Sequence, residues 1–369
     1  MEQFPTNHLP EEAKEHIKET LARGPEEIVT HGETMNDAEF TKTLLARKEM
    51  GIENEDRPVK IKPDLDGKSA LFLFDLAGIN YQKATFVSKG AHVPGSINVD
   101  TGERPRVTVE PDGTIFFDHH GSERLAKGSE TSATSLVYHT LIENGFLKPE
   151  PWLDQFVEFI THIDNANYDL PREFFEKEWS GSLYGLYRLI SFHALVDVFK
   201  QGGTIEHPFT KEQIEHETIE TENGTLQPIR ELIKKQQSFV ESNIKNIREA
   251  ERRQLSFNIK NFEPTELKKV VVNLISPEKN KKGAITYPNK IPLGFTAARG
   301  LGFDSYIIWN PENGGFFITS VHTLDTVYEK LKKDFPDVKL IRGTMIIQNP
   351  TGEKIAGQKF FEDLDLIKK

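Results

Sequence analysis

The sequence predicts an α/β fold with two domains joined by a helical connector. Its 369 residues exceed what one ordinary hydrophobic core organises. Strand-length apolar runs alternate with segments of helical periodicity, which is the pattern of an α/β sheet. The runs at 69–78 and 114–118 are apolar without alternation, as is typical of parallel strands covered on both faces. We therefore expect a parallel sheet in the first domain.

The elements of this first domain follow from periodicity and from helix stop signals. Ala13, Ile17 and Leu21 are spaced by four residues, and Gly24 follows them, so an amphipathic helix ends there. The expected elements, in chain order, are a helix within 1–25, a strand at 26–31, a helix at about 37–49, a strand at 69–78, a loop-rich segment at 79–112, a strand at 114–118, and helices at 129–145 and 151–164.

The second half of the chain predicts a connector and a smaller α/β domain. Its expected elements are a helical segment at 181–199, a long helix at about 226–255, strands within 268–275, 304–310 and 314–320, a helix at 322–334, and strands within 338–347. The expected divisions are a domain at 1–203, a connector at 204–262 and a domain at 263–369. The near-heptad apolar stripe of the long helix is compatible with a homodimer or with packing on its own domain.

Composition excludes several classes of protein. The 37% hydrophobic and 28% charged shares are those of a globular chain. The absence of cysteine excludes disulfides and Cys-ligated zinc and fits a reducing compartment. Because no signal-like or membrane-length apolar run is present, we expect a cytoplasmic protein with no membrane partner. A net charge of −11 argues against broad binding of duplex nucleic acid, although bound cations can reverse the local field for a small phosphate substrate.

Metal-binding side chains follow the predicted strands. In "TIFFDHHGSERL", the apolar strand ends in Asp118, His119 and His120. His31 ends the first strand, and Asp164 ends a predicted helix. Sites form at the carboxyl edge of an α/β sheet. Oxygen and imidazole ligands without cysteine suit Mn²⁺, and Zn²⁺, Fe²⁺ or Co²⁺ with less preference.

Asp75 belongs to the same set of candidate ligands. It lies at the end of the apolar run that begins at Ser69 and has no evident partner in the sequence. A buried carboxylate without a partner is costly, so ligand duty is the favoured interpretation.

Four sequence blocks resemble the DHH phosphoesterase superfamily. They are "IVTHGETMNDAEF", "LFLFDLAG", "FFDHHGSE" with the following "SATSLVYHTL", and "FITHIDNA", in that order across about 26–166. The chain looks most similar to the melanocyte-proliferating-gene exonuclease branch. The resemblance implies a DHH-type parallel-sheet domain, a smaller C-terminal α/β domain that binds substrate, and two Mn²⁺ per chain, with Mg²⁺, Co²⁺ or Zn²⁺ as possible substitutes.

The resemblance also implies roles for individual residues. His31 is expected to bind the first metal, and Asp75 to bridge both metals. His119 and Asp164 are expected to bind the second metal. His120 is expected to contact the substrate phosphate or assist the leaving group, while Asp118 orients an imidazole as a hydrogen-bond acceptor.

The first block leaves two alignments open. The usual pattern is His, three residues, Asp, one residue, Asp. A gapless alignment puts Met35 and Asp37 at the acid positions, whereas a loop two residues longer puts Asp37 and Glu39 there. The longer loop is preferred because Asp37, Glu39, Asp75 and Asp164 would then balance two dications, and an uncompensated buried charge is costly.

Several further residues are candidates for substrate contact. The start of the helix at 129–145 offers Ser129, Thr131 and Ser132, whose backbone N–H groups could bind a phosphate. In the C-terminal domain, Arg299, His322 and Arg342 lie at element ends and could hold a phosphate or carboxylate; their alternative role is to cap those elements.

The predicted function is metal-dependent phosphodiester hydrolysis by a two-metal mechanism. The favoured substrates are short single-stranded oligonucleotides, RNA or DNA, degraded by an exonuclease activity. One alternative is a phosphohydrolase of a cyclic or linear dinucleotide, a nucleotide or pyrophosphate. Another is a non-catalytic binding module, in which Met35 replaces a carboxylate and one metal is lost.

Overall fold

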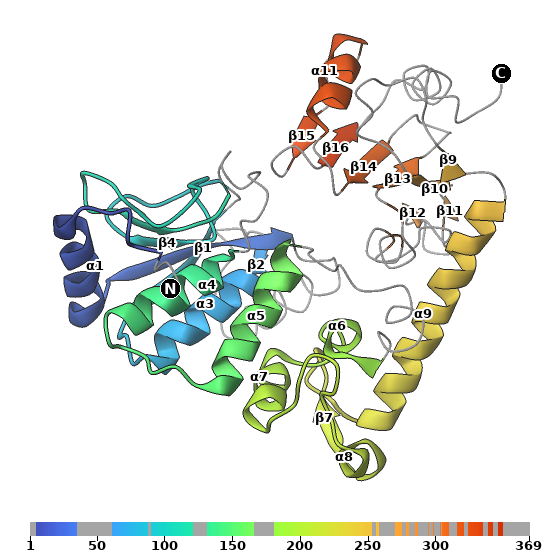
Figure 1. Cartoon of the computed structure of the whole chain (residues 1–369), viewed down its shortest axis with the longest axis horizontal. Coiled ribbons are helices and arrows are strands. Elements are labelled where there is room, and N and C mark those ends of the chain that lie inside the picture. The colour runs from blue at the N-terminus through green and yellow to red at the C-terminus, as the bar shows by residue number, and fades with distance from the viewer. Residues whose placement is uncertain are drawn as a thin grey trace. The chain divides into compact units, whose positions relative to one another are not determined.

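The computed structural model describes residues 5–34, 61–87, 90–120, 131–165 and 181–252, together with shorter segments between 256 and 349. The chain divides into two compact units, Met1–Asn165 and Ala166–Lys369 (Figure 1). The domain boundaries expected at residues 203 and 262 stay predictions. Within the described segments, no helix is both long enough and apolar enough to cross a membrane.

The described strands of the first unit form one six-stranded, mainly parallel sheet (Figure 1). The strands are β1 (Glu27–Thr34), β2 (Ile61–Pro63), β3 (Lys83–Val87), β4 (Ile97–Val99), β5 (Thr108–Val109) and β6 (Ile115–Phe117). β1 is parallel to both β3 and β4, and β4 is parallel to β6. β2 and β5 add antiparallel pairs. The predicted strands at 26–31 and 114–118 are confirmed as β1 and β6.

Four helices in the described part of this unit accompany the sheet: α1 (Glu11–Arg23), α3 (Leu65–Leu76), α4 (Ala133–Glu143) and α5 (Pro151–Asn165). α3, α4 and α5 pack against one another (Figure 1). The predicted helix within 1–25 is confirmed as α1, which buries Ile17 and Leu21 and ends before Gly24, whose φ is 81°. The helices predicted at 129–145 and 151–164 are confirmed as α4 and α5. The helix predicted at 37–49 lies outside the described residues.

The strand predicted at 69–78 is wrong, because this segment belongs to helix α3. A continuous apolar run does not distinguish a buried strand from a buried helix by periodicity alone. The helix begins after Asp64, whose side chain accepts a hydrogen bond from Gly67 N. Its buried residues recur at helical spacing, and they are Asp66, Gly67, Ser69, Ala70, Leu73 and Phe74.

The segment predicted as loop at 79–112 contains three strands, β3, β4 and β5. β4 has only three residues, all of them buried. Such a short strand carries no periodic signal, and the glycine and proline residues around it favour loop. Its position in the sheet comes from pairing with β1 and β6 on its two sides.

The second unit begins with helices and a hairpin. Its described elements here are α6 (Leu183–Leu186), α7 (Phe192–Lys200), α8 (Lys211–His216), β7 (Thr218–Glu220), β8 (Leu226–Pro228) and α9 (Ile229–Arg252). The helical segment predicted at 181–199 is divided, because Ser191 starts α7 as its N-cap. The long predicted helix is confirmed as α9, which buries Ile229, Leu232, Val240 and Ile244.

The remaining described strands form a second six-stranded sheet in the order β15-β16-β14-β13-β10-β9. They are β9 (Ser256–Phe257), β10 (Val270–Leu274), β13 (Ser305–Trp309), β14 (Phe316–Ser320), β15 (Lys339–Ile341) and β16 (Ile346–Asn349), accompanied by the β11–β12 hairpin (Glu278–Lys279, Ile285–Thr286) and α11 (Asp325–Asp334). The predicted strands and helix of this region are confirmed. The chain is therefore an α/β protein, as predicted.

Candidate metal centre

Acidic and imidazole side chains from five segments of the first unit meet at one edge of its sheet. They come from β1, from the residues after β4 and β6, from the start of α3 and from the end of α5, and they are His31, Asp64, Asp66, Asp100, Asp118, His119, His120 and Asp164. β1, β4 and β6 are parallel and in register, with Thr30 opposite Val99 and Val99 opposite Phe117. Their carboxyl ends therefore lie together, where sites of α/β sheets form.

One group of possible ligands consists of His31, Asp64 and Asp100, whose ligand atoms all lie within 4.8 Å of one another. Nε2 of His31 lies 3.1 Å from Asp64 Oδ2. Its Nδ1 atom lies 3.2 Å from Asp100 Oδ2. These residues come from three segments, so the group exists only in the folded chain.

A second group consists of Asp66, His119 and Asp164. Nε2 of His119 lies 3.1 Å from Asp164 Oδ2 and 3.6 Å from Asp66 Oδ2. His119 is 1% exposed, and Asp66 is 2% exposed. The group is thus held deep in the domain, where water competes weakly for the ligand positions.

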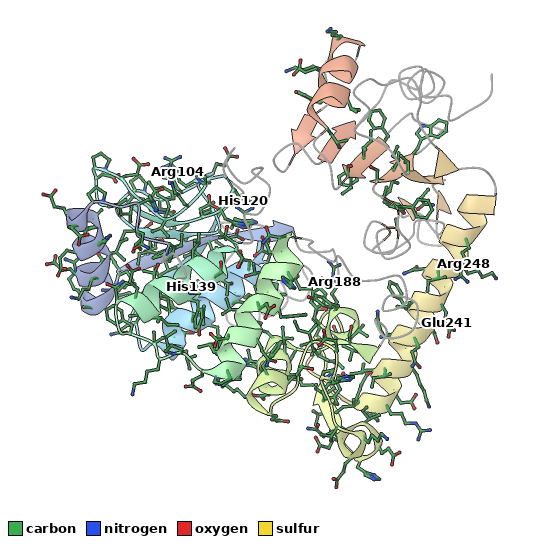
Figure 2. All side chains as sticks on the ribbon, in the orientation of Figure 1. Arg104, His120, His139, Arg188, Glu241 and Arg248 are labelled. Atoms are coloured by element: carbon green, nitrogen blue, oxygen red, sulfur yellow. The ribbon has the colours of Figure 1, made fainter. Side chains whose placement is uncertain are left out.

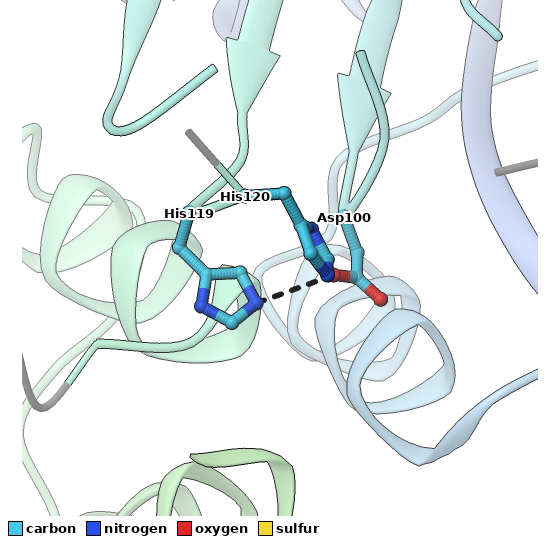
Figure 3. A group of neighbouring side chains, drawn as sticks. All are labelled: Asp100, His119 and His120. Atoms are coloured by element: carbon cyan, nitrogen blue, oxygen red, sulfur yellow. Dashed lines mark ion pairs between the residues drawn. The ribbon is translucent and has the colours of Figure 1, made fainter. Parts of the chain in front are cut away.

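Asp100 lies between the two groups. Its Oδ2 atom is on the side of His31, whereas Oδ1 lies 3.4 Å from His119 Nε2 and 3.3 Å from His120 Nδ1. Figure 3 shows both imidazoles turned toward this carboxylate. Both carboxylate oxygens are buried and accept no hydrogen bond within the described segments. Since buried acceptors are costly without hydrogen bonds or a cation, this position suits a ligand shared by two cations.

The backbone holds Asp100 in an uncommon conformation. Its φ is 54°, in the left-handed region that Asp adopts more readily than most non-glycine residues. The N–H group donates to Phe117 O at 2.9 Å, and the carbonyl oxygen contacts His31 Nδ1. Neighbouring strand ends therefore fix the direction of this side chain.

Asp118 shapes the turn that carries the two histidines. Its Oδ1 atom accepts hydrogen bonds from His119 N at 2.8 Å and from His120 N at 3.2 Å, and it lies 2.7 Å from His120 Nδ1. Oδ2 accepts from Arg104 N at 2.8 Å. Burial opposes ionisation of Asp118, but the hydrogen bond and charge of His120 outweigh it and lower the pKa of this carboxyl. Asp118 is thus a charged acceptor that orients the His120 ring.

The other carboxyl groups repel one another in the absence of a cation. Burial, with the charges of Asp164 and Asp64, raises the pKa of Asp66 to about 8. Burial and the charges of Asp64 and Asp66 raise the pKa of Asp100 well above its usual value. Burial also disfavours the Asp64 anion, but the hydrogen bond and charge of His31 outweigh it and lower its pKa to about 2. Full ionisation of this cluster therefore requires added positive charge.

These residues fit two divalent cations. His31, Asp64 and Asp100 would hold one ion, and Asp66, His119 and Asp164 would hold the other, with Asp100 placed to serve both. Four carboxylates supply a charge of −4, which two dications balance. A set of carboxylate oxygens and imidazole nitrogens suits Mn²⁺ and related divalent ions.

The structure does not bring Asp75 to this centre, so its prediction as the bridging ligand is wrong. Asp75 lies on the exposed face of α3 and pairs with Tyr81. It follows Asp66 by nine residues on one helix, which separates them by roughly 13 Å along the axis. Asp100, and not Asp75, lies between the two ligand groups.

The predicted phosphate-binding role of Ser132 is also corrected, whereas that of Thr131 stays a prediction. The N–H groups of Ala133 and Thr134 donate to the Asp66 carboxylate, each at 2.8 Å. Ser132 is the buried N-cap, and its own N–H donates to Ser135 Oγ. This helix terminus is therefore occupied by a carboxylate of the protein, which takes the place of a substrate anion.

Other predicted residues lie outside the described residues: Met35, Asp37, Glu39, Ser129, Arg299, His322 and Arg342. Among the described residues, the acid that meets His31 is Asp64, which belongs to an Asp64-x-Asp66 unit that neither alignment considered. The structure brings together His31, Asp118, His119, His120 and Asp164 of the predicted set.

Sequence reasoning missed Asp64, Asp66 and Asp100. The signal for the first two is "PDLDG", an acid pair with Pro and Gly directly after a short strand. The signal for Asp100 is "INVD", three residues of a buried strand and then a carboxylate, as in "IFFD" before His119.

The fold and site thus define an α/β protein with a candidate centre for two divalent cations. No protein-family model matches the sequence. The sequence is 26% identical over 175 residues to the oligoribonuclease NrnB of Bacillus subtilis (strain 168), covering 47% of this chain and 41% of that relative. The match thus spans about two fifths of the curated relative. It supports the resemblance to the DHH phosphoesterase superfamily without distinguishing the melanocyte-proliferating-gene branch.

Two solved structures show weak likeness. RecJ of Thermus thermophilus in complex with Mg²⁺ has a TM-score of 0.39 and 14% identity, covering 96% of this chain and 51% of that one. The same protein in complex with Mn²⁺ has a TM-score of 0.34 and 13% identity, covering 96% of this chain and 53% of that one.

Proposed function

We propose that this chain is a metal-dependent phosphodiester hydrolase that works with two divalent cations. The observation that carries the proposal is the position of Asp100, whose two carboxylate oxygens face the two ligand groups. The similarity to an oligoribonuclease supports the same class of chemistry. When bound, such ions activate a water molecule and stabilise negative charge that develops on a phosphoryl group.

His120 is the residue that we propose to act on the substrate. Asp118 contacts its Nδ1 atom, which leaves Nε2 available for a phosphate oxygen or for proton donation to the leaving oxygen. The His120 side chain is 10% exposed, whereas that of His119 is 1% exposed. His120 is thus the more accessible of the two imidazoles, while His119 is enclosed by carboxylates.

The proposed substrates are short single-stranded oligonucleotides, RNA or DNA, degraded exonucleolytically. Mn²⁺ is the proposed ion, with two per chain. The name of the relative supports an oligonucleotide substrate. The net charge of −11 disfavours broad binding along a duplex, whereas a short substrate can be held by a few contacts at the cations.

The non-catalytic alternative loses its original support. It rested on Met35 replacing a carboxylate in the first block. In the described cluster, Asp64 and Asp66 supply two carboxylates beside His31 and His119. These two carboxylates support the catalytic proposal over that alternative.

A substrate panel tests the proposal directly. The full chain is incubated with Mn²⁺ and a labelled short RNA, a short single-stranded DNA, a cyclic dinucleotide or pyrophosphate. We expect stepwise release of mononucleotides, lost in His119→Ala and retained in His139→Ala. His139 is a matched control, because it lies on α4 beside Tyr138 and belongs to none of the ligand groups of the described residues (Figure 2).

Two results would contradict the proposal. Full activity of His119→Ala would remove the centre from catalysis. Release of orthophosphate from pyrophosphate, without cleavage of oligonucleotides, would favour the alternative with a small phosphate substrate.

A further inference from the structure

The N-terminus of α4 connects two carboxylates of the candidate centre that are far apart in sequence. On one side, Asp66 Oδ2 accepts from Ala133 N and Oδ1 accepts from Thr134 N, each at 2.8 Å. The Thr134 hydroxyl also donates to Asp66 O at 2.9 Å. Asp66 is therefore fixed to this helix end by three hydrogen bonds, and the helix dipole favours its charge.

On the other side, the same helix end is tied to the last turn of α5, which carries Asp164. Oγ of Ser132 lies 2.9 Å from Thr161 Oγ1. The Asn165 side chain reaches two carbonyl groups: Nδ2 donates to Thr131 O at 2.8 Å and to Thr161 O at 2.9 Å. The residues before α4 and the end of α5 are therefore joined directly (Figure 1).

This tie bears on Asp164 because of where Asp164 lies. It is the next-to-last residue of α5, at the helix end where the dipole opposes a carboxylate. The last turn of a helix frays readily. The Asn165 side-chain amide adds a bond to Thr161 O within the turn and ties the turn to Thr131 O. Asp164 lies between Thr161 and Asn165 in sequence, and both of these residues are hydrogen-bonded to the segment before α4.

We propose that Asn165 is a positioning residue that holds the Asp164 carboxylate beside His119 for cation binding. The proposal rests on the proposed function in that it assigns Asn165 to the same centre. Asp164 Oδ2 lies 3.1 Å from His119 Nε2, and the two donor bonds of the adjacent amide keep it there. Asn165 touches neither substrate nor ion in this role.

Asn144 provides a matched control on the same pair of helices. It is the C-cap of α4, and its Nδ2 atom donates to Thr140 O at 2.9 Å, the same bond to the carbonyl four residues earlier that Asn165 makes. Asn165 makes the additional bond to Thr131 O. The two asparagines thus share the local capping bond and differ in the second bond, which reaches the start of another helix.

The experiment is titration of Mn²⁺ into the metal-free full chain by calorimetry. We expect two ions per wild-type chain. Asn165→Ala should weaken one of the two sites by about 10- to 100-fold, the usual range for residues that orient ligands. Asn144→Ala should bind both ions as the wild type does. The melting temperature of the metal-free protein should fall in both variants, because each loses a cap to the carbonyl four residues earlier.

The variant Asn165→Asp distinguishes a positioning role of Asn165 from a simple effect of charge on cation binding. It also keeps the side-chain volume, so it serves as the test if Asn165→Ala does not fold. The new carboxylate adds negative charge near a cation site, so charge alone would tighten binding. It cannot donate to Thr131 O and Thr161 O, so the positioning role predicts weaker binding. Tighter or unchanged binding in this variant would overturn the proposal, as would equal weakening in Asn144→Ala.

Failure of the proposed function can be distinguished from failure of the role proposed for Asn165. A wild type that binds two Mn²⁺ but cleaves none of the oligonucleotides would end the proposed function. The role of Asn165 would then still be supported by the loss of affinity in its variants. A wild type that binds no Mn²⁺ would overturn both.

Discussion

Oδ1 of Asp100 lies 3.4 Å from Nε2 of His119, although these residues follow two different strands. The contact exists because β4 and β6 are parallel neighbours in which Val99 and Phe117 are opposite each other. Oδ2 of the same carboxylate lies 3.2 Å from His31 Nδ1. Asp100 is therefore the one side chain in the described cluster that faces both ligand groups through separate oxygens, and the first prediction concerns it.

Asp100→Asn should lower Mn²⁺-supported hydrolysis by about 10²- to 10³-fold, because shared charge stabilisation is worth several kcal/mol. Asp75→Asn is the matched control, since this exposed carboxylate lies outside the ligand groups of the described residues. Its rate should stay within about two-fold of the wild type, as for most surface substitutions. Initial rates and Mn²⁺ stoichiometry check both variants. An equal loss in Asp75→Asn would reinstate the bridging role that the sequence suggested.

His120→Gln should lower kcat by about 10²- to 10⁴-fold and leave Mn²⁺ binding unchanged, because the role proposed for this imidazole is that of a general acid or phosphate contact. The His120 Nδ1 atom also lies 3.3 Å from Asp100 Oδ1, so a ligand role is the competing explanation. Calorimetric titration distinguishes the two. The loss of one bound ion in this variant would make His120 a ligand and contradict the acid assignment.

Gly67→Ala should destabilise the first unit, although alanine normally favours a helix. A Cβ atom at Gly67 would lie 2.3 Å from Thr30 Oγ1, so α3 would shift from β1 and carry Asp64 and Asp66 with it. We expect a loss of about 1–3 kcal/mol, the usual cost of overpacking, measured by urea unfolding.

Two further variants test this explanation. Gly181→Ala is the control, because no described residue lies within 4 Å of its added Cβ and the variant should unfold as the wild type does. The double variant Gly67→Ala/Thr30→Ala should be less destabilised than the sum of its single changes, because removal of the Thr30 hydroxyl relieves the clash. Strict additivity would show that contact with Thr30 is not the cause.

The metal-free protein should become less stable as the pH rises from about 4 to about 8. Burial and neighbouring charges raise the pKa of Asp66 to about 8 from its ordinary value of 3.8, and the pKa of Asp100 is raised as well. The folded state therefore binds more protons than the unfolded state in this window, so stability falls with pH. Asp64, with a pKa of about 2, contributes its opposite effect at lower pH.

Melting temperatures measured in a chelator across this pH range check the prediction. Mn²⁺ should remove most of the decline, because bound cations replace the protons as counter-charge. A melting temperature in chelator that rises steadily with pH across the window would contradict the assignment of raised pKa values to this cluster.

The sequence by itself determined the local parts of this site. An apolar run followed by Asp118, His119 and His120 predicts a strand with ligands at its tip, and the structure contains β6 there. The placement of His31 on a strand and of Asp164 near a helix end also follows from local patterns, because each depends on a few neighbouring residues. The α/β class came from the alternation of elements, which is likewise local.

Only the tertiary structure decided which carboxylates complete the centre. The run containing Asp75 is compatible with a buried strand or a buried helix, and packing against α4 and α5 made it helix α3, which places Asp66 at the site and Asp75 on the surface. β4 is too short to show a period, and its pairing with β1 and β6 brings Asp100 to the sheet edge. The closeness of His31 and Asp64 is equally invisible locally, because it depends on the antiparallel pairing of β1 with β2. Pairing and packing between distant segments are properties of the folded chain, and they selected the ligands.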